Sequence, residues 1–156
     1  MLINEGQELR MKNVLSYRAK ITQTEFNNAG LAINKFIEDG GFKKTGPTVS
    51  VTFSIEQQGA DHIMDTEILI PLDKEFNPPD GCTKKPEFYL TNALAIKNID
   101  SLVMVQKAYE VLSDYIARQN LQAITSAYNV TIQEPKTLTG DGMIMDVYIG
   151  VSRNIL

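Results

Sequence analysis

The most restrictive feature of this chain of 156 residues is that one order of sequence signals occurs twice. In each half a strand-like run precedes an amphipathic helix, and two further strand-like runs follow it. Local matches support the repeat, since residues 64–68 (MDTEI) resemble 145–149 (MDVYI) and residues 52–56 resemble 129–133. Consecutive strands of this kind form hairpins, so the sheet should be largely antiparallel. The sequence therefore predicts a duplicated βαββ module.

The repeat also sets the expected domain organisation. The pseudo-repeats run from about residue 12 to 72 and from about 88 to 153, joined by a proline-containing linker at 73–87. A chain of this length suits one domain and can bury a core without disulfide bonds. We expect residues 1–156 to form a single domain.

The periodicity of the apolar residues locates the expected elements. Apolar and polar residues alternate in six runs, which predicts the strands 14–22, 48–56, 63–72, 88–97, 124–133 and 143–152. Two segments have apolar residues at helical spacing, and we expect Thr24 and Asp100 to cap these helices. Because each helix has one apolar stripe, both should cover the same face of the sheet. The expected fold class is α+β, a largely antiparallel sheet with two helices on one face.

Composition excludes several classes of protein. A net charge of −4 argues against a nucleic-acid surface, which needs a basic face for phosphate. No run approaches the roughly 20 apolar residues of a membrane span, and the first residues lack the blocks of a signal peptide. The single cysteine, Cys82, cannot form a disulfide within the chain, which suits a reducing compartment. We expect a cytoplasmic protein that binds neither nucleic acid nor membrane.

The face of the sheet away from the helices is where strand alternation places the candidate binding residues. It is expected to carry short hydroxyl side chains, tyrosines and carboxylates, which would leave a groove with tyrosine walls. The candidate ligand-binding residues are Arg18, Thr52, Glu67, Tyr89, Asn129, Thr131 and Tyr148. A partly desolvated Glu67 would favour a cationic partner.

The sequence contains no evident catalytic set. It has no metal-ligand spacing, no phosphate-binding glycine loop that leads into a helix and no nucleophile elbow, so we expect no metal and no cofactor. This favours a non-enzymatic protein. A hydrolase with Glu67 as general base and Tyr148 or Tyr89 as acid remains an alternative.

The doubled βαββ order resembles that of the GyrI-like superfamily, the bacterial effector-binding domains found in AraC-type and MerR-type activators and as free-standing proteins. Gly46-Pro47 and the segment 65–72 (DTEILIPL) are similar to recurring features of that family. The resemblance implies a groove on the sheet that takes amphipathic or cationic small molecules. Because about a dozen residues precede the first expected strand, we expect a free-standing module without a DNA-binding helix-turn-helix.

The resemblance also implies roles for individual residues. Multidrug-binding members commonly place a glutamate on the first strand after the second helix, where this sequence has Asn129, an amide that cannot neutralise a cation. Tyr148 matches the tyrosine often found on the final strand, and Glu67 could supply the missing acid from the other half.

The function expected from these observations is a non-enzymatic, effector-type small-molecule-binding module with its ligand in a groove between the repeats. One alternative is a protein-interaction subunit, a homodimer or a heteromer, that uses the same face or an edge strand. The other is the small-molecule hydrolase.

Overall fold

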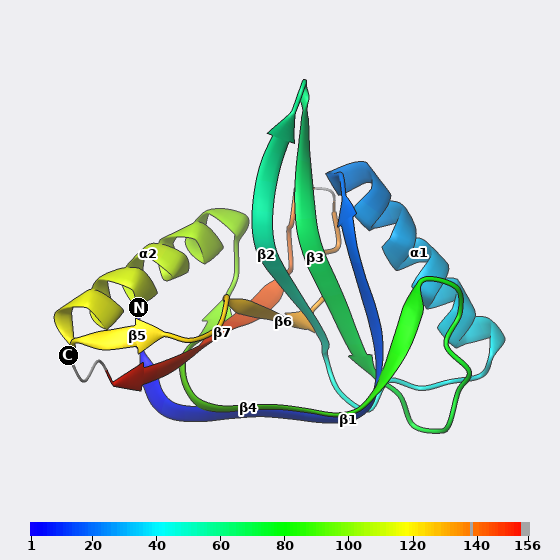
Figure 1. The fold of residues 1–156 in the computed structure, drawn as a ribbon, viewed down its shortest axis with the longest axis horizontal. Coiled ribbons are helices and arrows are strands. Elements are labelled where there is room, and N and C mark those ends of the chain that lie inside the picture. The colour runs from blue at the N-terminus through cyan, green and yellow to red at the C-terminus, as the bar shows by residue number, and fades with distance from the viewer. Residues whose placement is uncertain (138, 154–156) are drawn as a thin grey trace. The chain divides into compact units, whose positions relative to one another are not determined.

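The structure, a computed structural model, describes residues 1–137 and 139–153. In chain order the elements are β1 (Asn4–Ile21), α1 (Gln23–Asp39), β2 (Thr48–Gln58), β3 (Asp61–Pro71), β4 (Cys82–Ile99), α2 (Leu102–Arg118), β5 (Leu121–Ala123), β6 (Tyr128–Gln133) and β7 (Ile144–Arg153) (Figure 1).

The chain divides into two compact units. One consists of residues 11–88, and the other combines residues 1–10 with residues 89–156. The strands β1 and β4, of 18 residues each, contribute to both units.

The unit of residues 11–88 is a small antiparallel sheet covered by α1. Strand β3 pairs antiparallel with both β1 and β2. The buried side of α1 carries Ile33 and Ile37, which pack with Leu15, Ile68 and Ile70 of the sheet. Their 3.6-residue spacing on the helix and period of two on the strands place one apolar face against the other.

The unit of residues 1–10 and 89–156 follows the same plan around α2. Strand β7 pairs antiparallel with β4, β5 and β6. From α2, Ala108 and Leu112 pack in a buried cluster with Leu94, Ile96 and Val147 of the sheet. Figure 1 shows α2 lying along these strands.

These observations confirm the predicted fold class: the protein is α+β with mostly antiparallel strands and two helices. Each helix follows one long strand and precedes the hairpin strands of its unit, as the repeated order of signals predicts. That the two halves arose by duplication stays a prediction. No helix in the described part of the chain has both the length and the apolar character needed to cross a bilayer.

The helices begin at other residues than the sequence predicted. Thr22, not Thr24, caps α1: its side chain accepts a hydrogen bond from the Glu25 backbone, and the Glu25 side chain accepts one from the Thr22 backbone. This reciprocal capping box satisfies two backbone N–H groups instead of one. Ser101, not Asp100, caps α2 through a bond from Met104 N.

The strands β1 and β4 are longer than the alternating runs predicted. β1 begins at Asn4, and β4 begins at Cys82, so the last part of the predicted linker 73–87 is strand. Prolines at positions 78, 79 and 86 obscured this start, because proline donates no ladder hydrogen bond. The predicted fifth strand, 124–133, is shorter and begins at Tyr128, and a separate short strand, β5, precedes it.

Candidate functional site

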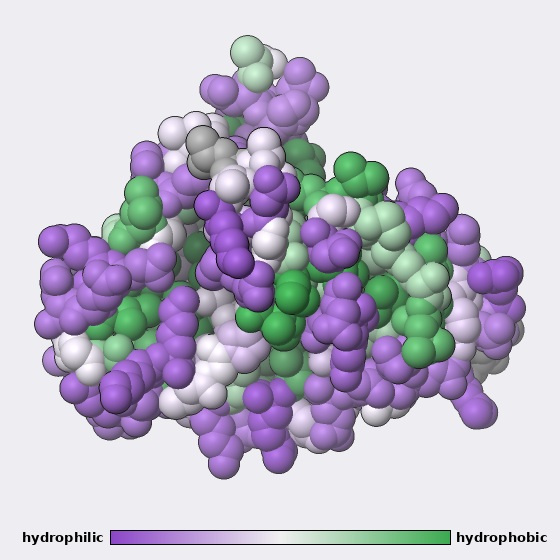
Figure 2. Space-filling model, turned by 180° about the vertical axis from the view of Figure 1, so that it is seen from behind, coloured by the Kyte–Doolittle hydropathy of each residue, from purple (hydrophilic) through white to green (hydrophobic). Residues whose placement is uncertain are grey.

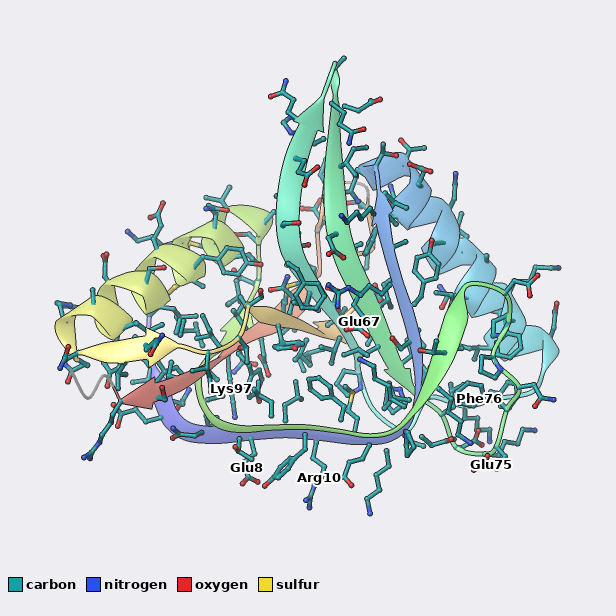
Figure 3. All side chains as sticks on the ribbon, in the orientation of Figure 1. Glu8, Arg10, Glu67, Glu75, Phe76 and Lys97 are labelled. Atoms are coloured by element: carbon teal, nitrogen blue, oxygen red, sulfur yellow. The ribbon has the colours of Figure 1, made fainter. Side chains whose placement is uncertain are left out.

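Glu67 lies on β3, on the face of its unit's sheet that points away from α1 (Figure 3). It is directly opposite Arg18 of β1 and Val51 of β2. Directly opposite residues of antiparallel strands share a face. Leu15 and Ile68, which pack with α1, alternate with this set and occupy the other face.

The face that carries Glu67 is not the open groove expected from the sequence. Glu67 is only 5% exposed, Val49 and Leu69 are fully buried, and Ser16 and Val51 are nearly so. At these positions the side chains are therefore covered, and short hydroxyl groups do not dominate.

Thr52 does not share a face with Glu67, contrary to expectation. Thr52 is directly opposite Thr66, so the two side chains share a face. Thr66 is adjacent to Glu67 in β3 and points to the opposite face, so Thr52 lies on the face that α1 covers. The uninterrupted alternation predicted over 48–56 holds only as far as Thr52, and up to that residue its phase relative to β3 was wrong by one residue. A register shift between Thr52 and Ser54 then brings Ser54 opposite Asp65, on the Glu67 face.

Within the part of the chain that the structure describes, two hydrogen-bond donors reach the carboxylate of Glu67, and both bind the same oxygen. Ser16 Oγ donates to Glu67 Oε2 at 2.5 Å, and Lys85 Nζ donates to that oxygen at 2.7 Å. The side chain of Glu67 is 6% exposed, whereas that of Lys85 is 40% exposed. We call these three residues the Glu67 site: a fixed, buried anion whose cationic partner is in contact with solvent.

The second oxygen of Glu67 remains available. No hydrogen bond to Oε1 is found among residues 1–137 and 139–153, although a carboxylate can accept about four. Within the same residues, the only fully buried side-chain oxygen or nitrogen without a partner is Asn13 Oδ1. Oε1 therefore keeps some access to solvent and could accept a donor from a bound molecule.

Arg18, predicted as a binding residue, forms a second ion pair beside the Glu67 site. Its Nε and Nη2 donate to the two carboxylate oxygens of Asp65, at 3.1 and 3.0 Å. The guanidinium also lies over the ring of Phe53, 4.1 Å from its centroid. The hydrogen bond from Arg18 lowers the pKa of Asp65 below its usual value of 3.8. Arg18 is thus held in place against one acid and one aromatic ring.

In the unit of residues 1–10 and 89–156, the predicted residues lie on opposite faces. Tyr148 of β7 is directly opposite Tyr128 and Ala95, on the face away from α2. Asn129 and Thr131 pair with Val147 and Met145 and so lie on the α2 face. This is the same error of phase as at Thr52.

The position of Asn129 accounts for its polarity. Tyr109 OH of α2 donates to Asn129 Oδ1 at 2.7 Å, so the amide satisfies a helix side chain. Burial raises the pKa of Tyr109, and the hydrogen bond to Asn129 acts in the opposite direction. The geometry gives Asn129 a structural hydrogen bond within its unit.

Tyr89 is partly exposed and belongs to a small surface cluster. Its hydroxyl donates to Glu8 Oε1 at 2.8 Å, and the Arg10 guanidinium lies 4.1 Å from its ring centroid. Figure 3 shows Glu8 and Arg10 on β1. Within this unit Tyr89 therefore contacts charged side chains of β1.

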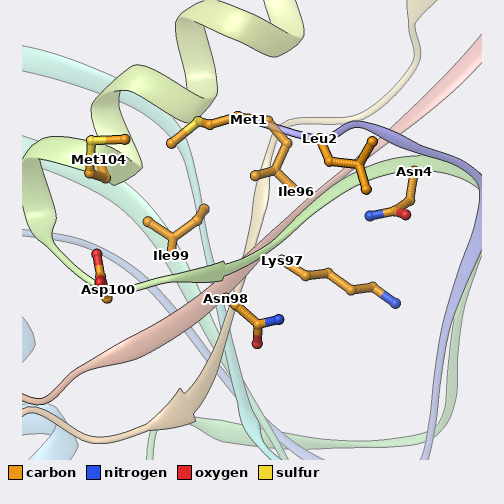
Figure 4. Close-up of a pocket in the computed structure, with 9 residues that line it drawn as sticks. All are labelled: Met1, Leu2, Asn4, Ile96, Lys97, Asn98, Ile99, Asp100 and Met104. Carbon is orange, nitrogen blue, oxygen red and sulfur yellow. The ribbon is translucent and has the colours of Figure 1, made fainter.

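The predicted residues do not line the surface pocket seen in the same unit. That pocket has a volume of about 520 Å³ and is lined by Met1, Leu2, Asn4, Ile96, Lys97, Asn98, Ile99, Asp100 and Met104 (Figure 4). Figure 2 shows apolar residues at the surface among mostly hydrophilic ones. No cluster of three or more potential metal ligands is found in residues 1–137 and 139–153.

Sequence reasoning missed two members of the Glu67 site. Alternation within the predicted strand 14–22 puts Ser16 on the same side as Arg18, but Ser16 was not among the candidate residues. Lys85 fell in the predicted linker and gave no signal, because its strand starts between prolines.

Comparison with known proteins gives matches among solved structures. No protein-family model and no curated protein matches the chain. The crystal structure of the EcmrR C-terminal domain has a TM-score of 0.68 and 12% identity, covering 99% of this chain and 100% of that domain. The cryo-EM structure of the EcmrR–DNA complex gives a TM-score of 0.68 and 13% identity over 98% of this chain, which spans 57% of that EcmrR chain.

Two proteins of Listeria innocua have similar folds. An uncharacterised conserved protein has a TM-score of 0.59 and 12% identity, and a hydrolase has a TM-score of 0.55 and 12% identity. Each match covers 95% of this chain and 93% of the other. These similarities confirm the fold expected from the resemblance to GyrI-like effector-binding domains.

Proposed function

We propose that this protein is a non-enzymatic small-molecule-binding module, and that its ligand contacts the Glu67 site. The observation that carries the proposal is a carboxylate that is 5% exposed, uses one oxygen for both of its hydrogen bonds and has a half-exposed cationic partner. The similarity in fold to the EcmrR C-terminal domain supports the class of function.

Solvation gives the physical reason. Taking a carboxylate out of water costs several kcal/mol, and this cost is offset only when its lone pairs find donors. Among the described residues, Glu67 finds donors for Oε2 alone, so a ligand that donates to Oε1 would complete its hydrogen bonding. A small molecule with a suitably placed N–H or O–H group would gain that energy on binding.

A thermal-shift screen of small molecules with the full chain tests the proposal. A ligand at about 100 times its Kd adds about 2.7 kcal/mol to the unfolding free energy. For a chain of this size that corresponds to a rise in Tm of about 5–10 °C. Glu67→Gln should abolish the rise, because the amide offers a weaker acceptor and adds donors.

The matched control is Glu56→Gln, which changes the same group at an exposed position of β2. This control should bind as the unaltered protein does. A screen in which no compound raises Tm, or in which both variants keep the response, would contradict the proposal.

The two alternatives stay predictions. The hydrolase hypothesis needs Glu67 beside a tyrosine hydroxyl, and within residues 11–88 its hydrogen-bond donors are Ser16 and Lys85. The protein-interaction hypothesis is addressed by measuring the size of the protein in solution.

A further inference from the structure

We infer that the protein associates as a two-fold symmetric dimer through an apolar surface at the start of α2, so that the partner is a second copy of this chain. The surface belongs to the unit of residues 1–10 and 89–156, and it shares no residue with the Glu67 site. The inference does not depend on the proposed function. It follows from exposed apolar residues, an adjoining pocket and two charged side chains, which together form a surface that complements itself.

The first turn of α2 is unusual because it consists of exposed apolar residues. Leu102, Val103 and Met104 are 60%, 78% and 38% exposed. Acidic residues are common in a first turn because they interact favourably with the helix dipole. The first turn of α1 contains Glu25, whereas that of α2 contains no acid. Consecutive exposed apolar residues of this kind are characteristic of interaction surfaces.

Exposed apolar residues from two segments of the unit contribute to this surface. We call it the α2 patch, and its members are Met1, Leu2, Leu102, Val103 and Met104. Met1, Leu2 and Met104 also line the pocket of about 520 Å³, together with the buried side chains of Ile96 and Ile99 (Figure 4). The patch therefore borders an apolar recess.

The patch offers an apolar projection as well as this recess. Successive helical residues are about 100° apart, so Val103 points about 200° away from the buried Val105, toward solvent. Of the polar residues that line the recess, Lys97, Asn98 and Asp100 are exposed, so an apolar side chain suits it better than a small molecule that needs buried polar groups. A two-fold axis brings the same patch of both copies together, and the projection of each copy then faces the recess of the other.

Two charged residues beside the recess make the surface self-complementary in charge. Lys97 and Asp100 are exposed and line the pocket, and within residues 1–137 and 139–153 neither forms an ion pair. Figure 4 shows their side chains extending in opposite directions. In a two-fold contact each residue meets its counterpart reciprocally, so Lys97 of either copy pairs with Asp100 of the other.

Sedimentation of the full chain at about 1–500 µM tests the association. The apparent mass should rise from that of one chain toward that of two, with a dimer Kd of about 1–100 µM, as expected for a small interface. Val103→Asp should raise this Kd by at least about tenfold, because a carboxylate is costly to bury in an apolar recess. An acid in the first turn favours the helix, so this variant should remain folded. Leu31→Asp is the matched control at an α1 position that is 69% exposed, and it should dimerise as the unaltered protein does.

Charge reversal tests the two-fold pairing. In a dimer, Lys97→Glu places carboxylates opposite each other and Asp100→Lys places ammonium groups opposite each other, so each variant alone should dimerise at least about tenfold more weakly. In an equimolar mixture of the two variants, every contact again joins a carboxylate to an ammonium group. The mixed dimer should therefore form with a Kd within about threefold of that of the unaltered protein.

Neutral variants serve if a charge-reversal variant is not folded by circular dichroism. Lys97→Gln removes both reciprocal ion pairs of the dimer, and Asp100→Asn removes the same two pairs. The double variant Lys97→Gln/Asp100→Asn should therefore weaken the dimer no more than either single change does, whereas additive losses would overturn the pairing.

The remaining results that overturn the inference are equally distinct. One is a chain that stays monomeric at the highest concentration. Another is a dimer that Val103→Asp does not weaken, or that Leu31→Asp weakens as much. A third is a mixture of the charge-reversal variants that associates no better than its components. Oligomers larger than a dimer would indicate a head-to-tail contact and would also overturn it.

Discussion

Replacing Lys85 by methionine should destabilise the protein even in the absence of any ligand. The change removes the cation and keeps a side chain of similar length and apolar volume. Of the two donors found in residues 1–137 and 139–153, it leaves the buried Glu67 carboxylate with Ser16 Oγ. The effect should therefore arise from the charge and its hydrogen bond.

Exposure sets the magnitude of this effect. Removing one partner of a fully buried pair costs about 3–5 kcal/mol, whereas an exposed pair contributes about 0–1 kcal/mol. With Glu67 6% and Lys85 40% exposed, the pair lies between these limits. We expect Lys85→Met to lower the unfolding free energy by about 1–3 kcal/mol, and Glu67→Gln by about 1 kcal/mol.

A double-mutant cycle measured by urea unfolding isolates the interaction. The double variant Glu67→Gln/Lys85→Met should be no less stable than Lys85→Met alone, because no buried charge is left unpaired. The coupling free energy should be about 1–2 kcal/mol. For a chain of this size, a loss of about 1–3 kcal/mol should lower the Tm of Lys85→Met by about 2–12 °C.

The result that refutes this reasoning is additivity. If the two single changes sum to the double change within about 0.5 kcal/mol, the pair contributes nothing measurable and Glu67 does not depend on Lys85. The exposed pair Lys35–Asp39 of α1 is the internal comparison, and its coupling should stay below about 0.5 kcal/mol.

Three further predictions address other parts of the molecule. Thr22→Ala should lower the unfolding free energy in urea by about 1 kcal/mol, since it removes the capping box, and Thr24→Ala by less than about 0.5; equal losses would argue for Thr24 as the cap. Arg18 lowers the pKa of Asp65 in the folded state, so the ionised carboxylate stabilises the fold above the unfolded pKa, and this contribution disappears as pH falls through the folded pKa. Asp65→Asn should therefore lose stability less steeply than the unaltered protein between about pH 5 and pH 2, and parallel curves would contradict this. Burial raises the pKa of Cys82 above 9.0, so iodoacetamide at about pH 8 should modify the folded chain more slowly than the urea-unfolded chain; equal rates would show a freely ionising thiol.

The fold was accessible from the sequence because its main signals are local. In α1 the helical spacing of Ile33 and Ile37 predicts the buried stripe that the structure shows. In β3 and β7 the alternating residues predict strands of nearly the observed extent. Local periodicity depends on neighbouring residues alone, so one sequence is sufficient to detect it.

Which residues share a face of the sheet was harder to predict from the sequence, because this depends on how neighbouring strands are aligned. Alternation shows that Val51 and Thr52 point to opposite sides, but it does not show which of them joins Glu67. Pairing decides this, and the register shift near Thr52 changes the phase within one strand. The same ambiguity placed Asn129 on the wrong face of its unit.

The candidate site was predicted in part for a similar reason. Glu67 was selected because strand alternation placed its carboxylate on the face where a groove was expected. Its partner Lys85 lies on another strand, whose start contains prolines, and no local pattern connects the two residues. Contacts between distant segments are set by register and topology, which one sequence does not reveal.

One of the two units is built from two separate stretches of the chain, and this limits which fragments of the protein can fold. A fragment that starts at Tyr89 would lack residues 1–10, and with them the hydrogen bonds that Asn4 donates to Ala95 and that Glu5 accepts from Tyr115. We therefore expect that the C-terminal half alone lacks part of its unit and does not fold independently. At high concentration an identical N-terminal segment from a second molecule offers the same hydrogen bonds, which is the chemical basis of strand exchange between copies.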